Sequence, residues 1–233
     1  MTAGVFVAGT DTGVGKTHTA VSLVVALRSA GYRVGVMKPV AAGVVTTNHG
    51  PRNDDAVALA AASAQPVEYD FLNPYLFEEP VAPHLAAADA GVEIDITLIE
   101  GAFAKLAERS DAMVVEGAGG WLVPVGPERT MADIARVLKL PVLLVVGMRL
   151  GCLNHALLTA SAVSATGLTI SGWVANCIDP EMRRLEQNIA ALVERLPAPL
   201  VATLPWEPSA TPESNAHRFN LGILGFAQTG PKP

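Results

Sequence analysis

The sequence has few cysteines and no long hydrophobic run, and each absence excludes a class of protein. Only Cys152 and Cys177 are cysteines among its 233 residues, too few for the disulfide framework of a small secreted domain. The longest continuous apolar stretch, residues 141–148, is far shorter than the roughly 20 residues that a membrane-spanning helix needs. The first residues lack the basic and apolar regions of a secretory leader. We therefore expect a cytoplasmic protein with no membrane segment.

Positive charge is scarce as well. There are 16 lysines and arginines against 22 aspartates and glutamates, which gives a formal net charge of −6. A protein that binds nucleic acid concentrates positive charge against the phosphate backbone, so we expect no nucleic-acid partner. Half of the residues are hydrophobic, and a chain of this length can therefore bury one substantial core.

Short apolar runs alternate with longer amphipathic stretches along the chain. We expect strands at residues 5–8, 33–38, 112–115, 142–147, 170–175 and 200–204, and helices at 17–29, from 53, 82–90, 96–108, from 130, 153–166 and 181–196. This alternation predicts a parallel sheet with helices on both faces. Residues 41–52 are expected to form a loop, and residues 67–83 an irregular excursion. We expect one α/β domain over residues 1–224 and a flexible C-terminal tail at 225–233, where glycine and proline are frequent.

The first expected strand leads into a glycine-rich turn and then a helix. The turn reads Gly9-Thr-Asp-Thr-Gly-Val-Gly-Lys-Thr17, in the sequence context of a phosphate-binding P-loop. Gly13 and Gly15 let backbone N–H groups approach phosphate oxygens at a helix N-terminus. Lys16 supplies a positive charge for the outer phosphates, and the threonine hydroxyl that follows it can coordinate Mg²⁺. Although five residues rather than four separate the outer glycines, the pattern predicts nucleoside triphosphate binding and a P-loop NTPase-like fold.

A carboxylate follows the expected strand at residues 112–115. Ligands of open α/β sheets bind at the carboxyl ends of the strands, and an acid there can hold Mg²⁺ as a Walker-B acid does. Glu116 stands at this position and a Gly-Ala-Gly-Gly turn follows it. The alternative is an ordinary glutamate at a strand end, but the nearby P-loop favours the metal role.

Two further side chains have competing interpretations. Asp55 could supply another oxygen ligand, yet it could equally stabilise the N-terminus of a helix capped by Asn53, and the residues alone favour this second interpretation. Lys38 ends the second expected strand, which we place beside the first, so its ammonium group is expected to point toward the ligand. An exposed lysine at a strand end is equally compatible with the sequence.

Seven motifs taken together resemble the dethiobiotin synthetase family. They are residues 9–17, Lys38-Pro-Val-Ala-Ala-Gly43, Arg52-Asn-Asp-Asp-Ala56, Asn73-Pro-Tyr75, Val115-Glu-Gly-Ala-Gly-Gly-Trp121, Gly151-Cys-Leu-Asn-His155 and Gly172-Trp-Val-Ala-Asn176. The match continues to about Glu213, and the longer P-loop is the family's own form. The resemblance implies a homodimeric ligase of biotin biosynthesis that converts 7,8-diaminopelargonate and CO₂ into dethiobiotin with ATP and Mg²⁺. A carbamate and then a carbamic–phosphoric anhydride are the implied intermediates.

The resemblance also implies roles for particular residues. Lys16 and Lys38 would be catalytic, and Thr17, Asp55 and Glu116 would hold the metal. The nucleotide would be bound by Gly13, Val14, Gly15, Lys16, Thr17, His18, Asp55, Glu116, Gly117, Ala118, Gly119, Asn176, Cys177, Pro205, Trp206, Glu207 and Glu213. The substrate would be bound by Ala42, Gly151, Cys152, Leu153 and Asn154, the last four from the partner subunit. Relatives commonly carry serine where this chain has Ala42, so that contact must be made differently here.

A dimeric P-loop ATPase switch of the partitioning type is the alternative function. Such proteins carry a second lysine five residues before the P-loop lysine, and here that position is Asp11. They also usually present a basic surface, which the net charge of −6 disfavours.

Overall fold

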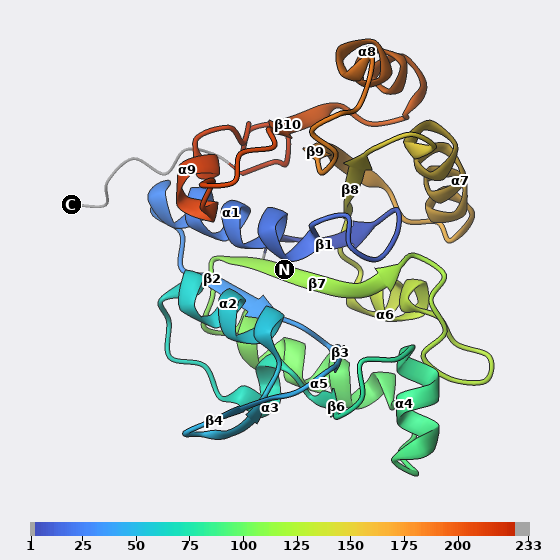
Figure 1. The fold of residues 1–233 in the computed structure, drawn as a ribbon. Helices are drawn as coiled ribbons and strands as arrows, with labels where there is room; N and C mark the ends of the chain where they lie inside the picture. Colours follow the sequence, from blue (N-terminus) through green and yellow to red (C-terminus); the bar gives the residue numbers. More distant parts are fainter. Residues whose placement is uncertain (1–2, 227–233) are drawn as a thin grey trace.

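Six parallel strands form the central sheet of this computed structural model, which describes residues 3–226 (Figure 1). The strands are β1 (Ala3–Gly9), β2 (Val34–Met37), β7 (Ala112–Gly120), β8 (Val142–Met148), β9 (Ile170–Cys177) and β10 (Leu200–Leu204). Their order across the sheet is β10-β9-β8-β1-β7-β2, and every neighbouring pair is parallel. The predicted α/β class with a mostly parallel sheet is confirmed.

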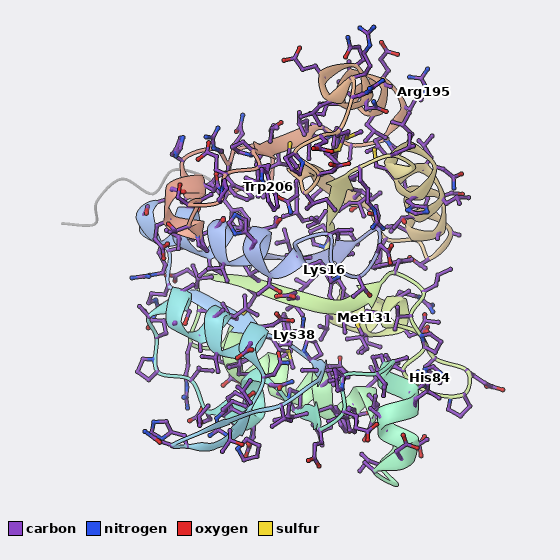
Figure 2. All side chains as sticks on the ribbon, viewed as in Figure 1. Lys16, Lys38, His84, Met131, Arg195 and Trp206 are labelled. Atoms are coloured by element: carbon purple, nitrogen blue, oxygen red, sulfur yellow. The ribbon has the colours of Figure 1, made fainter. Side chains whose placement is uncertain are left out.

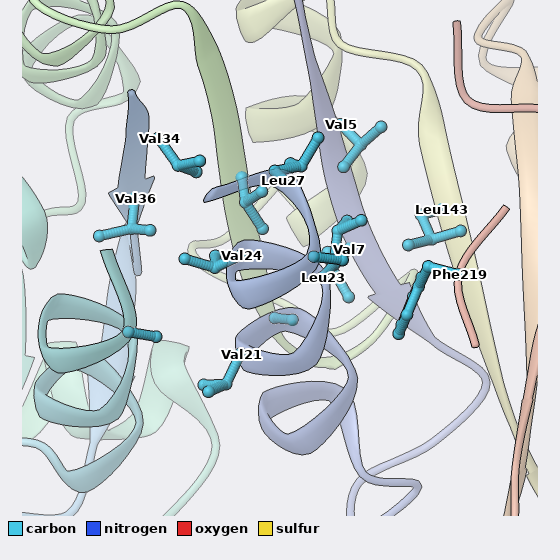
Figure 3. Close-up of a cluster of buried hydrophobic side chains, with 14 of the residues drawn as sticks. Val5, Val7, Val21, Leu23, Val24, Leu27, Val34, Val36, Leu143 and Phe219 are labelled. Carbon is cyan, nitrogen blue, oxygen red and sulfur yellow. The ribbon is translucent and has the colours of Figure 1, made fainter. Parts of the chain in front are cut away.

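Helices cover both faces of the sheet, as predicted. They are α1 (Lys16–Ser29), α2 (Asp54–Ser63), α3 (Tyr69–Leu72), α4 (Pro83–Asp89), α5 (Ile96–Ala107), α6 (Met131–Leu138), α7 (Cys152–Ala165), α8 (Leu185–Arg195) and α9 (Pro212–Ala216). Successive strand residues point to opposite faces. Val5 and Val7 therefore belong to the buried cluster on the side that carries α1, α2 and the C-terminal segment (Figure 3), whereas Phe6 belongs to the cluster on the side that carries α4, α5 and α6. The far end of that second side is covered by α7 and α8.

The structure differs from the sequence-based prediction in local details. The expected loop at 41–52 contains the short strands β3 (Val40–Ala42), β4 (Val45–Thr47) and β5 (Gly50–Arg52), and β6 (Tyr75–Phe77) lies in the expected irregular excursion. β3 pairs with β6, and β4 with β5. Strands of three residues are too short to show a hydrophobic period. β7 also continues past Glu116 to Gly120, so this acid lies within a strand rather than at its end.

One predicted pairing of neighbouring strands is wrong. The sequence-based prediction placed the second strand beside the first, but β7 lies between β1 and β2. The amphipathic pattern of a segment predicts that it forms a strand, yet the order of strands is decided by packing between segments distant in sequence.

The packed part of the chain extends beyond the predicted boundary at residue 224. Phe226 is 2% exposed, and its ring packs edge to face against Tyr32 at 5.6 Å between centroids. The rest of the predicted tail, residues 227–233, lies outside the described residues. Between residues 3 and 226, no helix is both long enough and apolar enough to cross a bilayer.

Replacement of Asn53 tests how the start of α2 is held. Its side-chain oxygen accepts from the N–H groups of Asp55 and Ala56, and its amide donates to the carbonyl of Gly43 at 3.0 Å. We expect Asn53→Ala to lower the free energy of unfolding by about 1–2 kcal/mol, because the cap is lost. Urea titration followed by circular dichroism measures this. Asn53→Asp keeps the cap, so its free energy of unfolding is expected to fall by less. Equal stability of the wild type and Asn53→Ala would contradict the interpretation.

Candidate active site

The turn after β1 forms a cradle of backbone N–H groups at the start of α1. Gly13 and Gly15 have φ angles of 74° and 84°, in the left-handed region that favours glycine. A Cβ atom on Gly15 would collide with the side-chain amide of Asn176. The first turn of α1 contains no acidic residue, so nothing there opposes an anion at the positive end of the helix dipole.

Four side chains from four parts of the fold converge beside this cradle. The Thr17 hydroxyl lies 2.8 Å from Asp55 Oδ1 and 2.8 Å from Glu116 Oε1. Lys38 Nζ donates to Asp55 Oδ2 at 2.7 Å and to Glu116 Oε1 at 2.6 Å. Thr17 opens α1, Lys38 follows β2, Glu116 lies in β7, and the Asn53 cap brings the first turn of α2 with Asp55 against them.

The sheet explains why Lys38 and Glu116 can meet. β2 and β7 are parallel neighbours with Met37 opposite Val115, so the next residues of both strands lie side by side at the same edge. Glu116 is 0% exposed and Lys38 is 3% exposed. Figure 2 shows Lys38 on one side of β7 and Lys16 on the other. The lysine therefore points inward, which resolves the two interpretations that the sequence left open.

The oxygen atoms of this cluster are suited to a hard divalent cation. Glu116 Oε2 is buried and has no hydrogen-bond partner among the described residues, and such an atom is costly unless something binds it. No group of three or more His, Cys, Asp or Glu side chains that could enclose a metal occurs in residues 3–226. Mg²⁺ does not need one, because it binds through one or two carboxylates and keeps water and phosphate ligands. Thr17, Asp55 and Glu116 fit that small donor set.

The charged side chains of this cluster shift one another's pKa values. Burial disfavours the charged form of Lys38, but Glu116 and Asp55 outweigh burial and raise the pKa of this lysine. Burial alone would raise the pKa of Asp55, yet Lys38, Thr17 and Lys16 hold the pKa of that carboxyl below its usual value. Lys38 is therefore an ammonium and Asp55 a carboxylate at neutral pH.

Lys16 occupies a different electrostatic position. Its Nζ donates to the backbone carbonyl of Asp11 at 3.0 Å, so this ammonium hydrogen-bonds within the P-loop. Burial and the neighbouring charge of Lys38 lower its pKa to about 8, against the opposing pull of Glu116, Asp55 and Asp11. An incoming anion would restore a fully charged Lys16.

A cavity of about 660 Å³ opens over this cluster. Its lining is Thr12, Gly13, Gly15, Lys16, Thr17, Lys38, Ala41, Ala42, Asn53, Asp55, Pro80, Val81, Ala82, Pro83, Glu116, Ala118, Gly119 and Val123. Most of the predicted phosphate and metal residues are among them, and so is Ala42. The segment 80–83 and Val123 were not foreseen, because apolar residues in loops give no sequence signal of a binding site.

The remaining predicted nucleotide residues do not line this cavity. Asn176 Nδ2 donates to the carbonyl of Val14 at 2.8 Å, so this amide supports the P-loop. His18 lies in the first turn of α1, next to the short helix α9 that carries Glu213. Trp206 is half exposed in the segment after β10 (Figure 2). Gly117, Val14 and Cys177 are buried and do not line the cavity.

The predicted carboxylate-binding residues are not part of this cavity. Gly151 has a φ angle of 95° and precedes α7, whose first residues are Cys152, Leu153 and Asn154. This helix begins after β8, beyond the P-loop, and none of the four residues lines the cavity. Within the described chain, the substrate residues are thus divided between the cavity, which includes Ala42, and the start of α7.

Comparisons with known proteins agree on one family. A family model described as an AAA domain matches residues 3–214. The ATP-dependent dethiobiotin synthetase BioD of Xanthomonas euvesicatoria pv. vesicatoria is 50% identical over 216 residues, which cover 93% of this chain and 96% of that protein. The protein of the same name from Pseudomonas paraeruginosa is 49% identical over 222 residues, covering 95% and 97%.

Solved structures show the fold alone, because their sequences are distant. The septum site-determining protein MinD of Pyrococcus horikoshii, complexed with Mg-ADP, superposes with a TM-score of 0.56 at 15% identity, over 98% of this chain and 91% of that one. The signal recognition particle 54 kDa protein of Aeropyrum pernix, in complex with GDP, superposes with a TM-score of 0.54 at 19% identity, over 96% and 46%. These resemblances confirm the predicted P-loop NTPase-like class.

The lowered pKa of Lys16 predicts a pH dependence of anion binding. Since the pKa is about 8 in the unliganded protein, ATP is expected to bind with constant affinity below pH 7 and progressively more weakly above pH 8. Calorimetric titration with a non-hydrolysable ATP analogue between pH 6.5 and 9.5 measures this. Lys16→Arg should flatten the profile, because a guanidinium stays charged throughout. A flat wild-type profile would disprove the assignment.

Proposed function

This chain belongs to the ATP-dependent dethiobiotin synthetase family, and from that premise we propose how its cavity performs ring closure. The chain is an ATP-dependent ligase. Its substrates in the proposed reaction are 7,8-diaminopelargonate, CO₂ and ATP, and its product is dethiobiotin. The convergence of Lys38, Glu116, Asp55 and Thr17 beside the P-loop is the observation that carries the proposal.

The difficulty of the reaction is electrostatic. One amine of the substrate captures CO₂ as a carbamate and loses a proton. A carbamate oxygen then attacks the γ-phosphorus of ATP and displaces ADP, which gives a mixed anhydride. The second amine attacks the carbonyl carbon of this anhydride, closes the ring and releases phosphate. The first transfer brings two anions together, so positive charge must stand between them. Lys16 and Lys38 supply that charge from opposite sides of β7. A carbamate is already a nucleophile, so the transfer needs no general base.

Mg²⁺ would be held by Thr17, Asp55 and Glu116, the oxygen donors whose geometry fits it. When bound, the ion neutralises charge on the phosphates. The chain's own contribution is to orient both partners. The N–H groups of the P-loop would hold the phosphates, and the ammonium of Lys38, which is fixed between two carboxylates, would stabilise the carbamate oxygen.

A second copy of the chain would complete the substrate site. We place the carboxylate of 7,8-diaminopelargonate at the start of α7, where backbone N–H groups of Cys152, Leu153 and Asn154 attract an anion. Because these residues lie away from the cavity of their own chain, a homodimer would supply them across an interface. The adenine base would lie between Asn176 and the segment with Pro205, Trp206, Glu207 and Glu213. We assign the reaction to the cytoplasm, where ATP is made.

Product analysis tests the proposal directly. The protein is incubated with ATP, Mg²⁺, bicarbonate and 7,8-diaminopelargonate, and dethiobiotin is sought by mass spectrometry; ¹³C-bicarbonate should add one mass unit to the ureido carbon. Reactions without bicarbonate or without ATP are the controls. ATP hydrolysis that is independent of the diamine, with no dethiobiotin, would instead favour an ATPase switch.

Removal of the Lys38 ammonium should separate chemistry from binding. We expect Lys38→Gln to leave ATP affinity within a few-fold and to lower turnover by at least about a hundredfold, since charge stabilisation of this kind is realised in the transition state. The buried Glu116 loses its partner, so stability is measured in parallel; breaking such a pair costs about 3–5 kcal/mol. Lys38→Gln with Glu116→Gln should recover stability and not turnover. Undiminished turnover in the single variant would remove Lys38 from the mechanism.

A further inference from the structure

Asn215 and Arg218, two residues without a role in the proposed reaction, connect the C-terminal segment to α1. α9 lies against α1 (Figure 1), and its Asn215 is 1% exposed. The side-chain amide of Asn215 makes two contacts: Nδ2 lies 2.9 Å from His18 Nε2, and Oδ1 accepts from Arg218 Nε at 3.0 Å. His18 directly follows Thr17 in α1, so this contact reaches the first turn behind the phosphate cradle.

The chemistry of these atoms allows only one arrangement of protons. A guanidinium can only donate, so the atom of Asn215 that faces Arg218 must be the oxygen. The NH₂ group therefore faces His18, and it too is a donor. His18 Nε2 must then accept, which requires a neutral imidazole with its proton on Nδ1. An imidazolium would place two donors against each other.

Arg218 links this amide to the segment after β10. Its Nη2 lies 3.8 Å from Glu207 Oε1. The contacts thus run from Glu207, just after β10, through Arg218 and Asn215 to His18.

We propose that Arg218 and Asn215 are positioning residues: they hold His18 as a neutral hydrogen-bond acceptor and thereby fix residues 205–219 over the start of α1. Neither residue lines the phosphate cavity. Their consequence for the nucleotide rests on the proposed function, because the segment they fix carries Trp206, Glu207 and Glu213 of the proposed base site. A preformed base site lowers the entropy cost of binding ATP and leaves the chemical step alone.

The proton arrangement can be observed without substrate or nucleotide. In ¹⁵N-histidine-labelled protein at pH 7.5, two-bond ¹H–¹⁵N correlations should show His18 with its proton on Nδ1. Asn215→Asp presents a carboxylate to the ring, and we expect the proton to appear on Nε2. His217, exposed and next to Arg218, is the internal control. A wild-type His18 with the proton on Nε2, or an unchanged tautomer in the variant, would overturn the proposal.

Kinetics test the effect on the nucleotide. We expect Arg218→Ala to raise KM for ATP about tenfold. Its kcat and its KM for 7,8-diaminopelargonate should stay within about twofold of the wild-type values. Arg218→Lys keeps a hydrogen-bond donor at this position and should recover most of the affinity for ATP. Arg109→Ala is the matched control, because it removes another exposed ion pair, with Glu68 at 3.3 Å. Equal effects of the two alanine variants would contradict the proposal. If no dethiobiotin forms, calorimetric titration of the same variants with ATP still tests the positioning role of Arg218, separately from the proposed function.

Discussion

A lysine ammonium buried between two carboxylates constrains the whole active site. Lys38 is 3% exposed, and a charge so deeply buried is tolerated only when it is paired and hydrogen-bonded. The pairing requires β2 beside β7 in one register, so that Lys38 and Glu116 leave the sheet together. It also requires α2 to start where the Asn53 cap places it, so that Asp55 reaches the same ammonium. The catalytic geometry and the stability of this sheet edge thus depend on the same contacts.

The pKa values of the two lysines in the cavity are shifted in opposite directions, and this difference suits two separate tasks. Fixed acids raise the pKa of Lys38. Burial and Lys38 lower the pKa of Lys16 to about 8, and its ammonium hydrogen-bonds to a P-loop carbonyl. Phosphate can therefore recruit Lys16 with a gain in electrostatic energy. Lys38 remains positioned for an anion that approaches from the side of β7 opposite Lys16.

Features encoded locally could be predicted from the sequence, and features that depend on distant contacts could not. The strand–turn–helix of the P-loop and the Asn53 cap arise within a few neighbouring residues, and the structure confirms them. The strand that became β7 was predicted, but its place between β1 and β2 was not, because pairing order is set by packing between distant segments. The role of Asn215 gave no signal either, since it lies 197 positions from His18 and belongs to no motif. The sequence left open whether Lys38 is exposed or points inward, because only the fold brings Glu116 beside it.

The distribution of charge in the cavity supports the proposal that a second copy of the chain completes the substrate site. A diamine that is also a carboxylic acid presents its reacting end and its carboxylate at opposite ends of an aliphatic chain. In the described lining, the cations are Lys16 and Lys38, and both stand at the phosphate end. The other walls include Ala41, Ala42, Pro80, Val81 and Val123, which suit an aliphatic chain but leave a carboxylate without a partner. A helix N-terminus can supply that partner without placing a third cation near the reacting carbamate. In the proposed homodimer, Leu150, which is 96% exposed immediately before Gly151 and the start of α7, would supply an apolar side chain to the interface.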